Sequence, residues 1–179
     1  QYFEEFFFFQ LGLALRHREV DRGTKPRAIS VDDRIRQAVL DVLPFRLTVD
    51  QRQALKEIVG DLQRPQPMHR LLQGDVGSGK TIVALLAALV VMENGLQVAF
   101  MSPTEILAAQ HYSNIKHLLK PSRFHAVLLT GTMGSTARRE ASQRLTMGDV
   151  QLVVGTHALV QEGVAFKTLG LVVIDEQHR

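Results

Sequence analysis

The sequence predicts an α/β fold in which a parallel β-sheet is flanked by helices and preceded by an N-terminal helical segment. From Met68 onward, short apolar runs alternate with longer segments of helical periodicity, which is typical of βαβ units. Each apolar run also passes directly into small or polar residues. In an open parallel sheet these residues lie along the carboxyl edge, where such folds bind ligands. The 179 residues suffice for one domain of this kind with a buried core, and not for two.

The composition is that of a globular protein, with 45% hydrophobic and 22% charged residues. The absence of cysteine excludes disulfides and thiolate zinc sites and fits a reducing cytoplasm. The formal net charge is only +3, but basic residues cluster near the N-terminus. This cluster is either a solvated helix end and linker or a contact to a nucleic-acid backbone. Its members are Arg16, His17, Arg18, Arg22, Lys25 and Arg27.

The first predicted element is a Phe-rich helix over residues 1–22, followed by a linker that Gly23 and Pro26 punctuate. Its apolar part is shorter than the roughly 20 residues needed to span a bilayer and contains acidic residues, so we expect no membrane segment. No signal peptide is expected either. The helix is expected to pack on a domain outside this sequence. Because the chain opens on Gln1 and stops at Arg179, we expect it to continue at both ends.

Two further helices are predicted before the alternating region. The first covers residues 31–43, with Ser30 as its cap and Pro44 ending it. The second begins after Thr48. Its buried stripe consists of Ala54, Leu55, Ile58, Val59 and Leu62.

The alternating region predicts five strands and four helices. The strands are expected at 70–73, 97–101, 126–129, 151–154 and 171–174. The helices are expected at about 80–94, 104–119, 135–147 and 156–161.

A phosphate-binding loop follows the first of these strands, where the sequence matches G-x-x-x-x-G-K-[ST] in full. It consists of Gly74, Asp75, Val76, Gly77, Ser78, Gly79, Lys80 and Thr81. The glycines allow successive N–H groups to point at phosphate oxygens, and the helix that begins near Lys80 adds its positive end. Lys80 is expected to reach the β- and γ-phosphates, and the Thr81 hydroxyl to bind Mg²⁺.

An acidic pair, Asp175-Glu176, follows the last apolar strand. Phosphoryl transfer needs a magnesium ion held against the phosphates and an oriented water. Asp175 is expected to hold the magnesium, usually through water, and Glu176 to activate the attacking water as general base.

Together with the phosphate loop, four more segments carry a resemblance to a known family. They are residues 102–111, 130–131, 155–159 and 175–179. With them, the chain resembles the superfamily 2 helicases, and most closely those of RecG type. The resemblance implies a RecA-like nucleotide-binding fold that uses ATP and Mg²⁺, with Gln51 hydrogen-bonding the adenine base.

The same resemblance implies contacts to DNA. It places Thr104, Thr130, Gly131 and Thr156 near the nucleic-acid backbone, and it gives His178 the role of coupling the nucleotide site to DNA. The residue types alone leave helix capping open for Thr104 and Thr156, and a histidine bonded to a neighbouring carbonyl for His178.

For the whole protein, the resemblance implies an ATP-dependent DNA translocase that acts on branched DNA in recombination and repair. Fork reversal and Holliday junction processing would be its tasks, in the cytoplasm and as a monomer. Residues 1–43 would be a helical linker from a preceding wedge domain, and residues 44–179 the first RecA-like lobe. A second lobe with the arginine finger would follow, so the chain alone is expected to be nearly inactive.

Three alternatives remain open. A transcription-repair coupling translocase has a very similar lobe, although residues 175–178 read Asp-Glu-Gln-His rather than the Asp-Glu-Glu-His typical of that group. A small-molecule P-loop kinase would have no reason to carry the segments 102–110 and 155–159. The chain in isolation could also be a nucleotide-binding module that does not hydrolyse ATP.

The remaining histidines lack metal-ligand spacing and are expected at the surface or in helix packing. They are His69, His111, His117 and His125.

Overall fold

The structure is a computed structural model that describes residues 25, 27–160 and 164–175. The helix expected over residues 1–22 and the predicted site residues Glu176 and His178 lie outside this range. Within it, no helix has the length and apolar character needed to cross a membrane.

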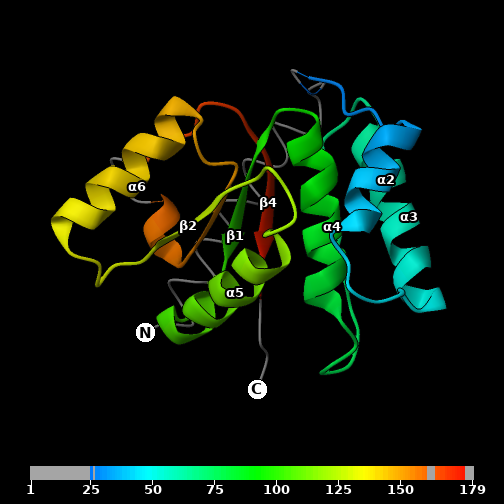
Figure 1. Cartoon of the computed structure of the whole chain (residues 1–179), viewed down its shortest axis with the longest axis horizontal. Helices are drawn as coiled ribbons and strands as arrows, with labels where there is room; N and C mark the ends of the chain where they lie inside the picture. The colour runs from blue at the N-terminus through cyan, green and yellow to red at the C-terminus, as the bar shows by residue number, and fades with distance from the viewer. Residues whose placement is uncertain (1–24, 26, 161–163, 176–179) are drawn as a thin grey trace.

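Four parallel strands form the described sheet, in the order β2-β3-β1-β4, and Figure 1 labels β1, β2 and β4. Their bounds are β1 Gln97–Met101, β2 Ala126–Leu129, β3 Leu152–Gly155 and β4 Leu169–Ile174. Each connection between consecutive strands contains helix, as parallel pairing requires. The predicted α/β class with a parallel sheet is confirmed.

Helices cover both faces of this sheet. The bounds are α2 Asp33–Asp41, α3 Val49–Gln63, α4 Lys80–Glu93, α5 Glu105–Leu118 and α6 Ser135–Met147, with a 3₁₀ turn η1 at His157–Val160. Alternate residues of β1 serve the two faces, as strand geometry dictates. Val98 and Phe100 join the cluster that contains α4 and α5, whereas Ala99 and Met101 join the cluster that contains α6 and η1.

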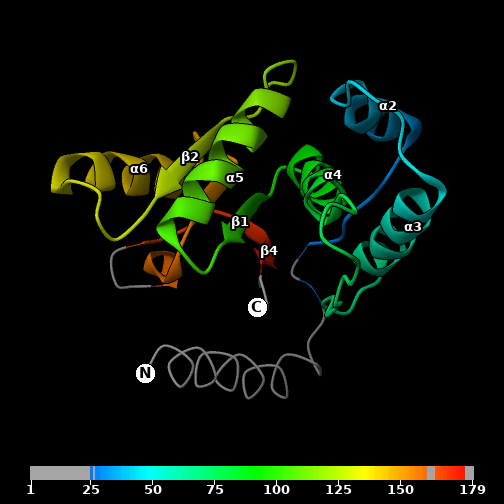
Figure 2. The ribbon, with the colours of Figure 1, turned by 90° about the horizontal axis from the view of Figure 1, so that it is seen from below.

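Helix α4 is the centre of the larger cluster. It lies between the sheet on one side and α2 and α3 on the other (Figure 2). A helix enclosed in this way needs apolar residues all round, and its buried residues run without a gap from Leu85 to Met92. The buried residues Ile29, Ile35, Val39 and Val42 belong to the same cluster, so the segment from Ile29 to Val42 packs on the core around α4.

The strand expected over residues 70–73 does not form, and this prediction is wrong. Arg70 instead bonds to two carboxylates of α3, with its Nε 2.7 Å from Asp61 Oδ2 and its Nη1 2.8 Å from Glu57 Oε2. Leu71 is 79% exposed. The ion pairs direct this segment to α3 rather than to the sheet, so β4 is the edge strand of the described sheet.

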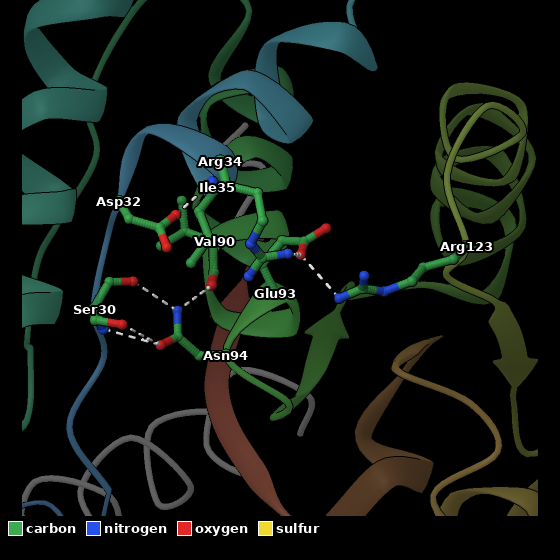
Figure 3. Close-up of polar contacts among 8 residues, drawn as sticks. All are labelled: Ser30, Asp32, Arg34, Ile35, Val90, Glu93, Asn94 and Arg123. Atoms are coloured by element: carbon green, nitrogen blue, oxygen red, sulfur yellow. Dashed lines mark hydrogen bonds and ion pairs between the residues drawn. The ribbon is translucent and has the colours of Figure 1, made fainter.

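The cap of the helix predicted over residues 31–43 is also different. Asp32 caps it, because its Oδ1 accepts from the Ile35 N–H at 2.8 Å (Figure 3). Ser30 instead pairs with Asn94 at the end of α4. The Asn94 amide accepts from the Ser30 N–H at 2.9 Å and donates to the Ser30 carbonyl at 2.9 Å. Ser30 therefore joins the segment before α2 to α4 instead of starting the helix.

Glu93, the last residue of α4, binds two arginines from different parts of the chain (Figure 3). Its Oε2 lies 2.9 Å from Arg123 Nη2 and 3.5 Å from Arg34 Nη1. The end of α4 is thus tied both to α2 and to the segment before β2. These contacts fix the C-terminal end of α4, whereas the phosphate loop is at its N-terminal end.

Candidate functional site

The phosphate loop has a backbone that only glycine adopts readily at two positions. Gly77 has φ 81° and Gly79 has φ 82°, both in the left-handed region. A Cβ on Gly74 would lie 2.7 Å from Ser78 Oγ, and a Cβ on Gly79 would collide with Gln51 Nε2. The loop is therefore a tightly curled cradle, as the sequence pattern predicts.

Lys80 is the first residue of α4, and its side chain folds back over the loop. Its Nζ donates to the carbonyls of Gly74 at 2.6 Å and Asp75 at 2.8 Å. The first N–H groups of a helix have no partner within it, so the start of α4 presents donors and a positive dipole beside a cation. This arrangement suits a phosphate.

Gln51 contacts the phosphate loop from α3. Its Nε2 donates to the Ser78 carbonyl at 2.9 Å. Its Oε1 accepts from the Thr48 N–H at 3.0 Å, and Thr48 Oγ1 accepts from the Gln51 N–H at 3.2 Å, which completes a capping box. Thr48 is confirmed as the cap of this helix, and the cap orients Gln51 toward the loop. The role of Gln51 in binding adenine stays a prediction.

Asp175 directly follows β4. Its N–H donates to the Met101 carbonyl at 2.8 Å, which extends the pairing of β4 with β1 by one residue. Its carboxylate Oδ2 lies 2.7 Å from His111 Nε2 on α5. The side chains of both residues are largely buried, at 24% and 14% exposed.

His111 is the site residue that sequence reasoning missed. A signal was present, because on α5 it lies at helical spacing from the fully buried Ala108 and Ile115. A histidine in the stripe that faces the sheet needs a polar partner, and Asp175 provides it. The other side of the ring packs against Phe100 of β1, with centroids 5.0 Å apart and planes tilted by 47°.

Asp175 and the phosphate loop lie at the same end of the sheet. In Figure 1 β4 points toward the lower part of the molecule, where the loop before α4 also lies. The structure thus brings Gly74–Thr81 and Asp175 to one edge, as expected for a parallel sheet with a ligand at its carboxyl edge.

The four residues expected near a nucleic-acid backbone lie along the same edge, with different exposures. Thr104 is exposed and caps α5, its Oγ1 accepting from the Leu107 N–H at 3.3 Å. Gly131 is exposed as well, whereas the side chains of Thr130 and Thr156 are buried. Capping is therefore the contact that Thr104 makes in this structure.

Glu105, beside Thr104, holds the neighbouring loop. Its carboxylate accepts from the Thr132 hydroxyl and, at 3.1 Å, from the Thr132 N–H. The hydroxyl bond, with smaller contributions from backbone N–H groups, lowers the pKa of Glu105. The start of α5 and the loop after β2 are thus joined by a charged hydrogen bond.

The residues present fit a nucleoside triphosphate with Mg²⁺. The loop offers glycine backbone, a lysine and the Thr81 hydroxyl, and Asp175 supplies a carboxylate at the same end of the sheet. Within the described ranges no group of three or more acidic, histidine or cysteine side chains is placed to hold a metal. Mg²⁺ is typically held by one or two carboxylates together with substrate phosphates, so such a cluster is not required. The buried Ser102 Oγ beside Asp175 lacks a protein partner among the described residues, which suits a polar ligand atom or water at this edge.

Comparison with known families decides the assignment. The DEAD/DEAH box helicase model matches residues 48–179. The chain belongs to the DEAD/DEAH box helicase family. The matched range contains the phosphate loop, all four strands and Asp175.

Individual members of this family are similar to the chain in sequence. The chain is 48% identical over 99% of its length to the ATP-dependent DNA helicase RecG of Aquifex aeolicus, and 46% identical over 99% to that of Synechocystis. A solved structure of RecG bound to a three-way DNA junction superposes with a TM-score of 0.81 at 43% identity, covering 98% of the chain. A hypothetical ATP-dependent RNA helicase from Sulfolobus tokodaii, 22% identical with a TM-score of 0.59 over 82% of the chain, shares the fold. The RecA-like helicase fold that the resemblance implies is confirmed.

These matches cover a small part of the relatives. The chain spans 22% of the Aquifex protein, 21% of the Synechocystis protein and 24% of the chain in the RecG–DNA structure. It spans 41% of the Sulfolobus protein.

Proposed function

We propose that the whole protein carrying this chain is an ATP-dependent DNA helicase that acts on branched DNA in recombination and repair, and that this chain is its ATP-binding lobe. The observation that carries the proposal is the placement of the Gly74–Thr81 loop and Asp175 at one sheet edge in a member of the DEAD/DEAH box helicase family. The similarity to RecG supports branched DNA as substrate. In this proposal residues 44–179 form the first lobe, residues 1–43 link it to a preceding domain, and a second lobe follows.

The loop and Lys80 would bind the triphosphate. The Lys80 ammonium lies 2.6 and 2.8 Å from loop carbonyls, so it is already held at the mouth of the cradle. When a phosphate enters, the ammonium can exchange these neutral acceptors for charged oxygens, which form the stronger hydrogen bonds. The helix N-terminus adds N–H donors at the same point.

Thr81 and Asp175 would hold Mg²⁺, the former by its hydroxyl and the latter through water. The metal ion would neutralise charge on the phosphates. Glu176 would take the proton of the attacking water, which its place directly after Asp175 allows. Gln51, fixed between the cap of α3 and Ser78, would hold the adenine base near the loop.

In this proposal the DNA backbone contacts the segments that lie along the same sheet edge as the phosphate loop. Thr104 and Gly131 are exposed at the same edge and offer a hydroxyl and backbone groups, which grip phosphates without reading bases. Thr130 and Thr156 are 5% and 2% exposed as whole residues, so in this proposal a contact to DNA by either would require this edge of the sheet to open. His178 would relay DNA contact to the nucleotide site.

The test is replacement of Lys80 by alanine in the whole protein, beside Lys56→Ala as a matched control on the exposed side of α3. We expect Lys80→Ala to lose tight binding of ATP with Mg²⁺ in calorimetric titration, together with unwinding of a three-way DNA junction. Lys56→Ala should keep both. Equal ATP affinities for Lys80→Ala and the unmodified protein would refute the nucleotide site, and a protein that hydrolyses ATP but leaves the junction intact would refute the substrate.

A further inference from the structure

We infer that His111 is a positioning residue for Asp175, and through it for the magnesium ion that accompanies the nucleotide. His111 would hold the Asp175 carboxylate in one orientation, leaving its second oxygen to serve the metal. The inference rests on the proposed function, since it concerns the metal of that site.

The first support is the contact itself. His111 Nε2 and Asp175 Oδ2 are 2.7 Å apart, the distance of a charge-assisted hydrogen bond. An ionised carboxylate can only accept, so Nε2 must carry the hydrogen. The bond joins residues 64 positions apart in sequence, from α5 and from the end of β4, so it reflects the tertiary fold and not local chain geometry.

The second support is that neighbouring groups hold both partners in place. The backbone of Asp175 is fixed to β1 by its bond to the Met101 carbonyl. The imidazole of His111 is wedged against Phe100, and its helix is anchored on the sheet by the fully buried Ala108 and Ile115. Because His111 is firmly packed, its hydrogen bond restricts the rotation of the Asp175 carboxylate.

The third support is the chemistry of metal sites. Groups that bind a metal ion are commonly oriented by a second hydrogen bond, and loss of that partner typically costs about 10–100-fold in metal affinity or activity. Asp175 has one carboxylate oxygen in such a bond.

Thr104, the cap of α5, lies seven positions before His111, about two helical turns, and therefore on the same side of the helix. Helix α5 thus connects an exposed rim residue to the proposed metal site within one lobe.

The experiment compares two amides at position 111 in the whole protein. In His111→Gln the side-chain nitrogen extends about as far as Nε2 and can donate to Asp175. In His111→Asn the amide is one methylene shorter and cannot reach. Both variants lose the contact with Phe100 and both stay polar, so they differ mainly in the bond to Asp175. Circular dichroism and thermal melting establish that each is folded.

The readout is the affinity for Mn²⁺, a spectroscopic substitute for Mg²⁺, measured by electron paramagnetic resonance in the presence of saturating ATP analogue that resists hydrolysis. We expect His111→Asn to bind Mn²⁺ about tenfold more weakly and His111→Gln to stay within threefold of the unmodified protein. Affinity for the analogue without metal should be the same in all three, which a merely structural defect would not give. In an Asp175→Asn background, His111→Asn should have no additional effect on Mn²⁺.

Equal Mn²⁺ affinity in His111→Asn and the unmodified protein would overturn the inference, as would equal losses in both amide variants. Neither result would affect the proposed function, because the nucleotide would still bind. An unmodified protein that binds no nucleotide would overturn the proposed function itself, and the inference with it.

Discussion

At the scale of single residues, one methyl group at Gly79 would meet two obstacles. The residue has φ 82°, which an alanine adopts only under strain, and the new Cβ would collide with the Gln51 amide that binds the Ser78 carbonyl. We predict that Gly79→Ala lowers the affinity for ATP by at least about tenfold, because it displaces both the loop and Gln51, a change of about 1.4 kcal/mol. Calorimetric titration with ATP and Mg²⁺ measures it.

Gly60→Ala is the matched control for this substitution. Gly60 lies inside α3, and a Cβ built on it has no atom within 4 Å. Alanine there should raise the free energy of unfolding by about 0.5–1 kcal/mol and leave ATP affinity unchanged. If Gly79→Ala behaved like Gly60→Ala, the conformation of the loop would not be needed for nucleotide binding.

Spacing alone predicts Lys80 and the glycines as a phosphate loop, because a loop that wraps a phosphate needs those residues in that order. The positive φ angles of Gly77 and Gly79 suit this prediction, and nucleotide binding by the loop stays a prediction. The pair of His111 and Asp175 could not be predicted in this way. It depends on which side of α5 faces the sheet and on the strand order that brings the end of β4 beside β1, and neither can be read from local periodicity.

At the scale of elements, the predictions were most accurate where one local pattern has no competitor. The bounds of β1, β2 and α6 were predicted to the residue, and α4 to within one. Residues 70–73 show the opposite case. Their apolar pattern predicts a strand, but Arg70 finds two carboxylates on α3, and tertiary ion pairs prevail over propensity. Likewise Asp32 prevails over Ser30 as a cap because Asn94, far away in sequence, binds Ser30.

Gln97 holds three elements together where β1 begins. It is 2% exposed, and its Nε2 donates to the carbonyls of Leu145 at 2.8 Å and Val150 at 2.7 Å. Its Oε1 accepts from the Thr168 N–H at 3.0 Å. One amide thus fixes the end of α6, the approach to β3 and the approach to β4.

We predict that Gln97→Leu lowers the free energy of unfolding by about 3 kcal/mol, because it fills the space but leaves buried backbone groups without partners. Gln143→Leu, on the exposed side of α6, should change it by less than about 0.5 kcal/mol. Urea unfolding followed by circular dichroism measures both. A loss below about 1 kcal/mol at position 97 would mean that water or a shifted backbone replaces the amide.

At the scale of the whole molecule, the edge of the sheet at β4 is only half covered within the described residues. Leu171 and Val173 pack on the cluster around α4, whereas Val172 and Ile174, on the opposite face, are 46% and 36% exposed. Apolar edge strands favour pairing with other chains. Any measurement on the 179-residue chain alone therefore has to be made on its monomeric fraction.

The last prediction concerns what this chain can do by itself. We expect the isolated chain to bind ATP weakly and to hydrolyse it about 10³-fold or more slowly than the whole protein, with no acceleration by DNA. The proposed site has its cation and helix N-terminus on one side of the phosphates, at Lys80. An arginine supplied from the other side contributes about 10³–10⁵ in rate in related phosphoryl-transfer enzymes, and in this proposal it belongs to the second lobe.

DNA should fail to accelerate the isolated chain for a separate reason. One lobe can hold a strand at Thr104 and Gly131, but closure of two lobes is what would complete the site and exclude water. The measurement is ATP hydrolysis by the chain and by the whole protein, each with and without a three-way junction, with Lys80→Ala of the whole protein as the background rate. A chain that works within tenfold of the whole protein and speeds up further with DNA would show that the catalytic groups all lie within these 179 residues, and the proposed division between two lobes would have to be abandoned.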